Sequence, residues 1–307
     1  MSKIAFIYPG QGAQYIGMGQ EFYEQTETGK KTFDKASELL GFSMPDLCFK
    51  ENDQLNITEY TQAAMVTVSI AMTKVLNELG VFADVTAGLS LGEYAALFAA
   101  GVMREEDAIT VVRQRGILMQ EAVPAGIGAM AAILALENET IEKVTKDIED
   151  VWIANYNCPG QIVISGKKEA VDLACEKLKE AGAKRTLSLN VSGPFHSGML
   201  VQAGEKLGKV LEGISLNTPS IPYVANVTAD YVTDASKVRD LLTRQVSSSV
   251  RWQQSVEAMI ADGTDTFVEI GPGKTLSGFM KKISRDVKVM NIEKLADMEK
   301  AVEELKH

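Results

Sequence analysis

A serine and a histidine are the residues of this chain best suited to nucleophilic chemistry. Ser90 lies in the sequence Gly-Leu-Ser-Leu-Gly, residues 88–92, between an apolar stretch and a helix-forming run. The two glycines allow a sharp turn from strand to helix that exposes the serine between them. Since a serine hydroxyl is a weak nucleophile, it needs a neighbouring base. The motif predicts a nucleophile at Ser90, ahead of the alternative of a tight turn with a solvated serine.

Two histidines are present, and one of them, His307, is the last residue of the chain. Because chain termini are usually frayed, we expect His307 to play no part in catalysis. His196, in the sequence Gly-Pro-Phe-His-Ser, is the histidine that could serve as the base for Ser90.

An arginine on a predicted helix could recognise an anion. Arg115 and Arg113 are two residues apart, so their side chains point in different directions. Arginine is suited to bidentate recognition of a carboxylate, and the adjacent Gly116 allows a close approach. Taken from these residues alone, a salt-bridged surface arginine is the slightly favoured alternative.

The loop after the first predicted strand carries two side-chain amides, Gln11 and Gln14. An amide there could donate a hydrogen bond to a developing oxyanion, although a surface turn is the favoured interpretation of this loop taken alone. Two nucleotide-binding motifs are incomplete. Residues 273–275 match the end of a P-loop, but Val268 occupies the position of its first glycine, and residues 10–15 lack the third glycine of a dinucleotide fingerprint.

Composition limits the classes of protein. The chain has 307 residues, of which 46% are hydrophobic and 23% are charged, and its net charge is −10. This charge argues against nucleic-acid binding. No apolar run approaches the ~18 residues of a membrane span, and the first residues do not resemble a signal peptide. Three scattered cysteines, Cys48, Cys158 and Cys175, form no metal or disulfide pattern, so we expect a cytoplasmic protein with reduced, mostly buried thiols and no metal.

Hydrophobic periodicity predicts an α/β protein with a mostly parallel sheet covered on both faces. Helices are expected over residues 33–40, 63–79, 106–123, 199–211, 238–246, 255–262 and 275–283, and strands over 3–8, 85–89, 221–226, 266–270 and 287–292. Residues 126–193 follow the order β-α-β-β-α-β, which is typical of a ferredoxin-like unit. We therefore expect a ferredoxin-like subdomain at 126–193, inserted into a catalytic domain formed by 1–125 and 194–307.

The chain resembles the malonyl-CoA:acyl carrier protein transacylases of fatty-acid synthesis, and the acyltransferase domains of polyketide synthases, over essentially its whole length. The matching motifs are short, but they occur in the order of the family. They are found at residues 9–14, 88–94, 115–116 with 119–120, 155–161, 193–197, 226–229 and 271–274. The resemblance implies an α/β-hydrolase-like core with a ferredoxin-like subdomain, in agreement with the element order.

The resemblance also implies a two-step acyl transfer that supplies fatty-acid synthesis. Ser90 would attack the thioester of malonyl-CoA while His196 takes its proton, and the backbone N–H groups of Gln11 and Leu91 would hold the oxyanion. Acyl carrier protein would then accept the malonyl group on its phosphopantetheine thiol. No cofactor is required, and malonyl-CoA and acyl carrier protein are the implied partners. A polyketide pathway remains an alternative destination.

Two further roles follow from the resemblance. Arg115 would pair with the free malonyl carboxylate, and the backbone carbonyl of Gln245 would orient His196 in place of the carboxylate of an ordinary triad. The chain departs from the family at Leu89, because the family usually has histidine immediately before the serine. This difference leaves open the polarity and packing of the pocket next to the nucleophile.

Two other functions stay open at this point. A serine esterase or thioesterase would share Ser90 and His196 but would need no buried cation, so Arg115 distinguishes it. A non-catalytic docking module for carrier protein would not need the intact serine and histidine. Since acyl carrier proteins are generally acidic, docking needs a local basic patch, and residues 184–185 or the group Lys281, Lys282 and Arg285 on one predicted helical face could form it.

Overall fold

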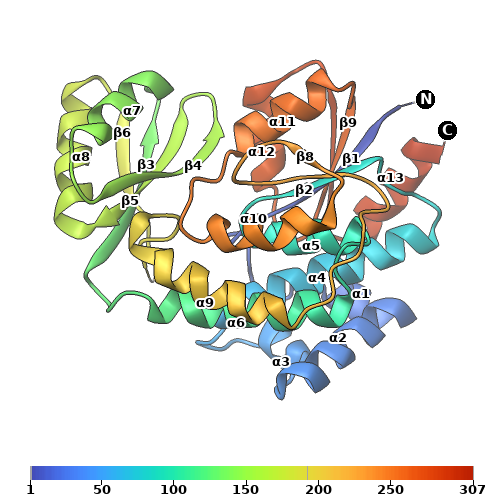
Figure 1. Ribbon diagram of the computed structural model, residues 1–307. Helices are drawn as coiled ribbons and strands as arrows, with labels where there is room; N and C mark the ends of the chain where they lie inside the picture. Colours follow the sequence, from blue (N-terminus) through green and yellow to red (C-terminus); the bar gives the residue numbers. More distant parts are fainter. Residues whose placement is uncertain (1, 192, 307) are drawn as a thin grey trace.

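Two β-sheets of different kinds organise the computed structural model, which describes residues 2–191 and 193–306 (Figure 1). His307, which we expect to be frayed, lies outside these residues. The larger sheet has the strand order β10-β9-β1-β2-β7-β8. Its first five strands pair in parallel and only β7 and β8 pair antiparallel. The strands are β1 Ile4–Tyr8, β2 Val85–Gly88, β7 Tyr223–Val224, β8 Tyr231–Val232, β9 Thr266–Ile270 and β10 Lys288–Ile292.

Helices cover both faces of this sheet because successive strand residues point to opposite sides. In β1, Ala5 and Ile7 face one core cluster, whereas Phe6 and Tyr8 face the other. The first cluster is closed by α11 Trp252–Ala261 and α12 Thr275–Ile283. The second is closed by α1 Gln20–Gln25, α2 Glu27–Leu40, α3 Met44–Phe49, α4 Thr58–Glu78, α5 Gly92–Ala99, α6 Glu105–Glu121, α9 Val201–Glu212, α10 Val238–Gln245 and α13 Leu295–Lys306.

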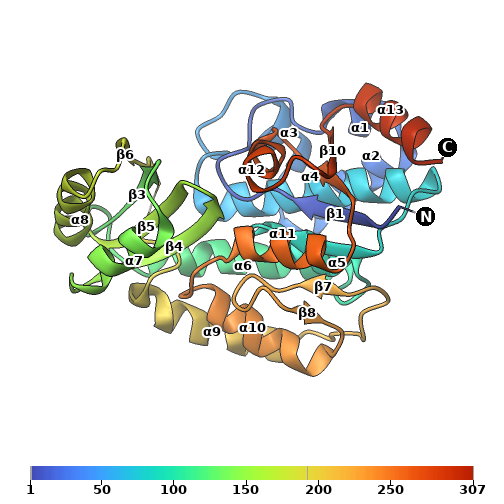
Figure 2. The same ribbon diagram turned by 90° about the horizontal axis from the view of Figure 1, so that it is seen from above.

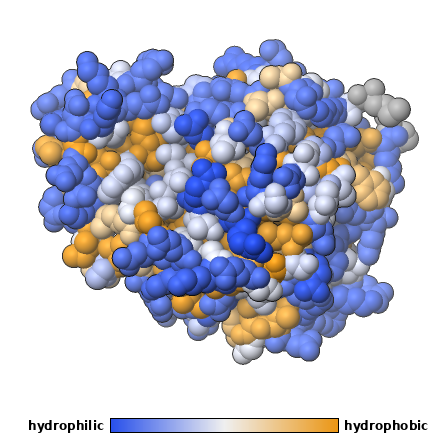
Figure 3. All heavy atoms as spheres, in the orientation of Figure 1, coloured by the Kyte–Doolittle hydropathy of each residue, from blue (hydrophilic) through white to orange (hydrophobic). Residues whose placement is uncertain are grey.

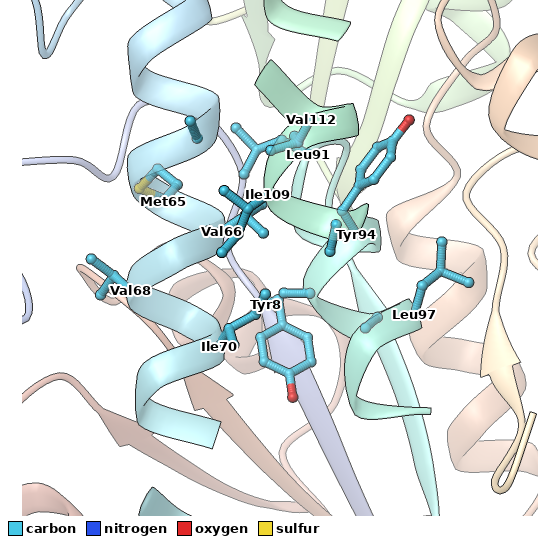
Figure 4. Close-up of a cluster of buried hydrophobic side chains, with 14 of the residues drawn as sticks. Tyr8, Met65, Val66, Val68, Ile70, Leu91, Tyr94, Leu97, Ile109 and Val112 are labelled. Carbon is cyan, nitrogen blue, oxygen red and sulfur yellow. The ribbon is translucent and has the colours of Figure 1, made fainter. Parts of the chain in front are cut away.

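The helix α4 forms the centre of the larger cluster. Its buried side chains lie on all sides of the helix, as expected for a helix that is enclosed by other elements. Figure 4 shows its residues Val66 and Ile70 packed against side chains of α5, α6 and β1. Since α5 carries the turn that contains Ser90, and α6 carries Arg115, this packing fixes the elements that bear the candidate site.

The smaller sheet is antiparallel, with the order β4-β5-β3-β6. It forms a separate lobe with its two helices, at one end of the molecule in both Figures 1 and 2. The helices pack on one face of the sheet around a cluster of aliphatic residues such as Ile133, Ile164 and Val171. In chain order the elements are β3 Gly128–Leu134, α7 Asn138–Lys146, β4 Val151–Cys158, β5 Gln161–Lys167, α8 Lys168–Glu180 and β6 Arg185–Ser188.

Backbone hydrogen bonds join the small lobe to the main one. Strand β4 shifts its register with β5 between Ile153 and Asn155, and it forms a parallel bridge with Val250 there. The N–H of Val250 donates to Ala154 O over 2.8 Å, and its carbonyl accepts from Tyr156 N over 2.9 Å. The bulge in β4 therefore lets one strand belong to both lobes.

Several predicted elements differ from the structure. The strand expected at 221–226 shrinks to β7, because Pro222 cannot donate to a ladder and the chain turns back at Ala225, whose N–H meets Asp230 O. The short elements α1, α3 and β8 were not predicted. The single basic face predicted for Lys281, Lys282 and Arg285 is wrong, because α12 ends at Ile283 and the next residue is extended.

The predicted positions of the thiols are largely confirmed. Cys48 and Cys158 are buried, whereas Cys175 is partly exposed. On the face shown in Figure 3, hydrophilic side chains predominate and apolar ones form scattered patches. Over the described ranges, no helix is both long enough and apolar enough to cross a membrane.

Candidate active site

The predicted turn at Ser90 connects strand β2 directly to helix α5. Ser90 has a φ of 54°, in the left-handed region that a non-glycine residue rarely adopts. The flanking glycines are sterically required, since a Cβ on Gly88 would lie 2.0 Å from the backbone of Gly92 and a Cβ on Gly92 would lie 2.4 Å from Tyr8 O. This crowded turn presents the serine side chain at the carboxyl end of the parallel strands.

The structure brings His196 to Ser90, although the two residues are 106 positions apart. The Oγ of Ser90 lies 2.7 Å from Nε2 of His196. The Nδ1 of His196 lies 2.8 Å from the backbone carbonyl oxygen of Gln245. Because a carbonyl can only accept, Nδ1 carries the ring proton and Nε2 is left to accept the proton of the serine hydroxyl. Ser90, His196 and Gln245 thus lie in the order that the resemblance implies.

Burial keeps the imidazole neutral. His196 is 4% exposed. Desolvation, and then the positive charge of Arg115, lower the pKa of His196 to about 4, against the ordinary value of 6.5. A histidine with a lowered pKa remains an unprotonated base at neutral pH.

We expect the rate of serine acylation to persist at acidic pH. The base is active when neutral, so its lowered pKa moves the acid limb of kcat/KM from near 6.5 down to about 4. Since the charge of Arg115 contributes to this shift, Arg115→Ala should move the limb back upward. The measurement is the pH dependence of kcat/KM for an uncharged acyl thioester. A limb near 6.5 in the wild-type chain would contradict the assignment of His196 as a buried base.

Arg115 is completely buried, which overturns the slightly favoured interpretation of a surface arginine. Its Nη2 donates to Ser90 Oγ and to Gln245 Oε1, both over 3.0 Å, and its Nη1 donates to Gln62 Oε1 over 2.7 Å. All these acceptors are neutral. Desolvation lowers the pKa of the Arg115 guanidinium from its ordinary value. A buried cation whose hydrogen-bond partners are neutral is able to pair with an anionic group beside the nucleophile.

The neighbouring Arg113 forms the salt bridge that was expected of Arg115. Arg113 forms an ion pair with Glu59 and stacks over the Tyr60 ring, 4.2 Å from its centroid. Directly after Arg115, Gly116 allows α6 to approach α4, since a Cβ there would lie 2.6 Å from the Cα of Glu59. This close contact places the Arg115 side chain beneath the nucleophile.

A cleft of about 730 Å³ leads to Ser90 and His196. Its walls come from both lobes and include the side chains of Asn155 and Asn157 on β4. Leu89 lines the cleft where the family usually has histidine, and a Cβ on Gly10 would lie 2.5 Å from its Cδ2. The change from histidine therefore makes this part of the wall apolar and close-packed against the N-terminal loop.

The N-terminal loop lies beside the nucleophile. The side chain of Gln11 donates to Thr58 and that of Gln14 donates to Asn56, so both amides hold the loop rather than point to an oxyanion. Within the described part of the chain, the backbone N–H groups of Gln11 and Leu91 enter no hydrogen bond. Two such groups next to Ser90 fit the requirement of an oxyanion hole.

Sequence reasoning missed two contributions. Gln62 was not singled out, although it is a large polar residue that directly precedes the apolar run 63–66 of α4, which is a signal that could have found it. The side chain of Gln245 was also missed, because only its carbonyl was considered. For the residues that the structure describes, no group of acidic, histidine or cysteine side chains could hold a metal ion.

A mostly parallel α/β fold with a serine, a neutral histidine and a buried cation defines an enzyme that works through a serine nucleophile. The chain matches the model of the acyl transferase domain over residues 5–305, and it belongs to this family. It is 47% identical to the malonyl CoA-acyl carrier protein transacylase of Bacillus subtilis (strain 168), over 100% of this chain and 98% of that protein.

Solved structures of relatives have the same fold. The crystal structure of MCAT from Streptococcus pneumoniae has 45% identity and a TM-score of 0.95, and the match covers 99% of this chain and 100% of that one. A structure described as a type II PKS acyl-carrier protein in complex with its malonyl-transacylase has 40% identity and a TM-score of 0.96, with 99% and 100% covered.

Proposed function

We propose that this chain transfers the malonyl group from malonyl-CoA to the phosphopantetheine thiol of acyl carrier protein, as an S-malonyltransferase of fatty-acid synthesis. The observation that carries the proposal is the buried guanidinium of Arg115, 3.0 Å from the Oγ of Ser90. A simple esterase needs no cation at this point, whereas a malonyl group ends in a free carboxylate. The relatives named as malonyl transacylases over the full chain support the same substrate.

In the first half-reaction, Ser90 Oγ attacks the thioester carbon while its proton passes to Nε2 of His196. The negative charge that develops on the thioester oxygen is held by the N–H groups of Gln11 and Leu91. The C–S bond then breaks, and the His196 imidazolium returns the proton to the CoA sulfur. The products are a malonyl ester of Ser90 and free CoA thiol.

In the second half-reaction, the thiol of the carrier-protein arm gives its proton to His196 and attacks the ester carbon. The bond to Ser90 Oγ breaks, and the serine regains the proton. Because acyl transfer between a thioester and an ester is balanced without a redox or metal step, the reaction requires no cofactor. The carboxylate of the malonyl group stays paired with Arg115 through both steps.

The same proposal assigns the parts of the chain. Residues 1–125 and 194–307 form an α/β-hydrolase-like catalytic domain, and residues 126–193 form a ferredoxin-like subdomain that supplies one wall of the cleft. Its strand order β4-β5-β3-β6 and the order of its elements support that name. A carrier-protein substrate and reduced thiols favour a cytoplasmic location.

Incubation of the chain with malonyl-CoA, followed by intact mass and transfer to purified carrier protein, tests the proposal. We expect a stable mass gain of one malonyl group on Ser90, and loss of that gain when carrier protein is added. A hydrolase would release malonate instead, and a docking module would gain no covalent group.

Docking should depend on local basic clusters, because the net charge of −10 opposes attraction to an acidic partner. Lys184 and Arg185 are exposed at the start of β6, and Lys281 and Lys282 are exposed at the end of α12. Reversing the charge of a docking cluster should raise the KM for carrier protein, more so at low salt.

The first half-reaction with malonyl-CoA reports whether such variants keep an intact site, and its rate should not change. Lys300→Glu on α13 is a matched control, since Lys300 is an exposed lysine on another part of the main lobe. If reversal of both clusters leaves the KM and its salt dependence at the level of this control, docking takes place elsewhere.

A further inference from the structure

The carboxamide of Asn226 spans the turn that presents the nucleophile. Its Oδ1 accepts from the N–H of Ser90 over 2.7 Å, and its Nδ2 donates to the carbonyl of Gly88 over 2.6 Å. One planar side chain therefore holds the peptide groups on both sides of Leu89. Asn226 lies in the loop between β7 and β8, 136 positions after Ser90, and it is 1% exposed.

Asn226 is itself held in place by two hydrogen bonds of its own backbone. Its N–H donates to Glu93 Oε2 on α5 over 3.3 Å, and its carbonyl accepts from the N–H of Arg251 over 2.9 Å. The side-chain amide of Gln245 donates to the same Glu93 oxygen over 2.6 Å and to the carbonyl of Ser90 over 2.9 Å. Both peptide groups of Ser90 thus meet an anchored, buried amide side chain.

This arrangement matters because Ser90 is in a strained conformation. A non-glycine residue at positive φ persists only where its surroundings hold it. The N–H of Ser90 is occupied by Asn226, whereas the N–H of Leu91 remains without a partner in the described structure. The side chain of Asn226 therefore binds the Ser90 N–H, which holds the turn, and leaves the Leu91 N–H available to the oxyanion.

We propose that Asn226 is a positioning residue, whose carboxamide holds the Ser90 turn so that the serine Oγ meets His196 while the Leu91 N–H faces the reacting carbonyl. Asn226 does not line the cleft, so it acts through Ser90. The inference rests on the proposed function for its substrate, but it concerns the reactivity of Ser90 towards any acylating group.

Single-turnover acylation by malonyl-CoA, followed by intact mass, measures this reactivity. Asn226→Ala removes both contacts across the turn. We expect the maximal acylation rate to fall roughly 100-fold, the size of effect expected when a reacting group is misplaced by about 1 Å. The malonyl-CoA concentration at half-maximal rate should stay within about twofold, because binding at Arg115 is untouched.

Asn226→Asp separates the two contacts by pH. The ionised carboxylate accepts from Ser90 but repels the Gly88 carbonyl, whereas the protonated carboxyl donates to Gly88 and restores both contacts. The charged and titratable groups around this position are Glu93 on α5, and Arg115 and His196 across Gln245 and the serine. At about pH 5.5, where His196 is still neutral, we expect Asn226→Asp to acylate at least about tenfold faster than Asn226→Ala.

Thr86→Val is the matched control for both variants. Thr86 is a buried residue of β2, and its Oγ1 donates to Ala96 O of α5 over 3.0 Å, so the variant loses a hydrogen bond within the same strand and helix pair. It should lower the thermal stability but keep the wild-type acylation rate. An organophosphonate fluoride probe of activated serines should rank the variants in the same order as malonyl-CoA does.

The proposal is overturned if Asn226→Ala acylates at the wild-type rate or slows no more than Thr86→Val. It is also overturned if Asn226→Asp is no faster than Asn226→Ala at acidic pH. If Asn226→Ala does not fold, the ratio of the Asn226→Asp rate to the wild-type rate at acidic and at neutral pH decides. Failure of the wild-type chain to take malonyl while it still reacts with the phosphonate would refute the substrate, and would leave the role of Asn226 to be judged by the phosphonate rates.

Discussion

Replacing Ser90 with alanine is expected to abolish the malonyl-enzyme while leaving the fold intact. Loss of the nucleophile in a serine hydrolase removes on the order of 10⁶-fold in rate, and the same loss is expected here. Alanine keeps the Cβ of serine, so it tolerates the backbone φ of 54° as well as serine does. The measurement is intact mass after incubation with malonyl-CoA, together with a thermal melt.

His196→Ala should be similarly inactive, since it removes the base that lies 2.7 Å from Ser90 Oγ. A melting temperature close to that of the wild-type chain shows that the lost activity does not come from unfolding. Malonyl label that persists on the Ser90→Ala variant, at any residue, would refute the assignment of the nucleophile.

Replacing Arg115 with alanine is expected to change acyl preference rather than remove all activity. A malonyl carboxylate left unpaired in a buried site costs several kcal/mol, which corresponds to a loss of at least roughly 100-fold. Acetyl-CoA carries no such charge, so its transfer should lose little or gain. The measurement is kcat/KM for the two thioesters, expressed as the ratio of malonyl to acetyl transfer.

Arg113→Ala provides the matched control for this experiment. It removes an arginine two residues away that pairs with Glu59 and stacks on Tyr60, outside the cleft. Its effect on the two thioesters should be small and equal. Equal losses for both thioesters in Arg115→Ala would instead make Arg115 a structural residue that supports Gln62 and Gln245.

The features that could be predicted from sequence are those that depend on residues adjacent in the chain. The glycines at 88 and 92 predict the turn at Ser90, because the turn has no room for a Cβ at either position. The apolar stretch in α4 predicts a central helix, since a helix without a polar face must be enclosed. The alternation of strands and helices predicts the parallel sheet. The strand predicted at 221–226 was longer than β7, because pairing at its end depends on a turn that the pattern does not reveal.

The burial of Arg115 could not be derived from its own neighbourhood. Arg113 and Arg115 stand in similar local sequence, and both contact α4. Arg115 differs in that it also reaches Gln245 on α10. The partner Gln245 lies 130 positions further along the chain. Only the resemblance to a family pointed to a carboxylate at Arg115, whereas the residues alone slightly favoured the surface.

The hydrogen bonds between Val250 and β4 limit how substrates and products can enter and leave the cleft. Separating the two lobes would break the paired hydrogen bonds between Val250 and β4, so neither half-reaction is expected to proceed by hinge opening. We therefore expect CoA to leave, and the carrier-protein arm to enter, through the same mouth of the cleft, one after the other. The slow amide hydrogen exchange expected at Tyr156 and Val250 should then be the same in the free and the malonylated protein.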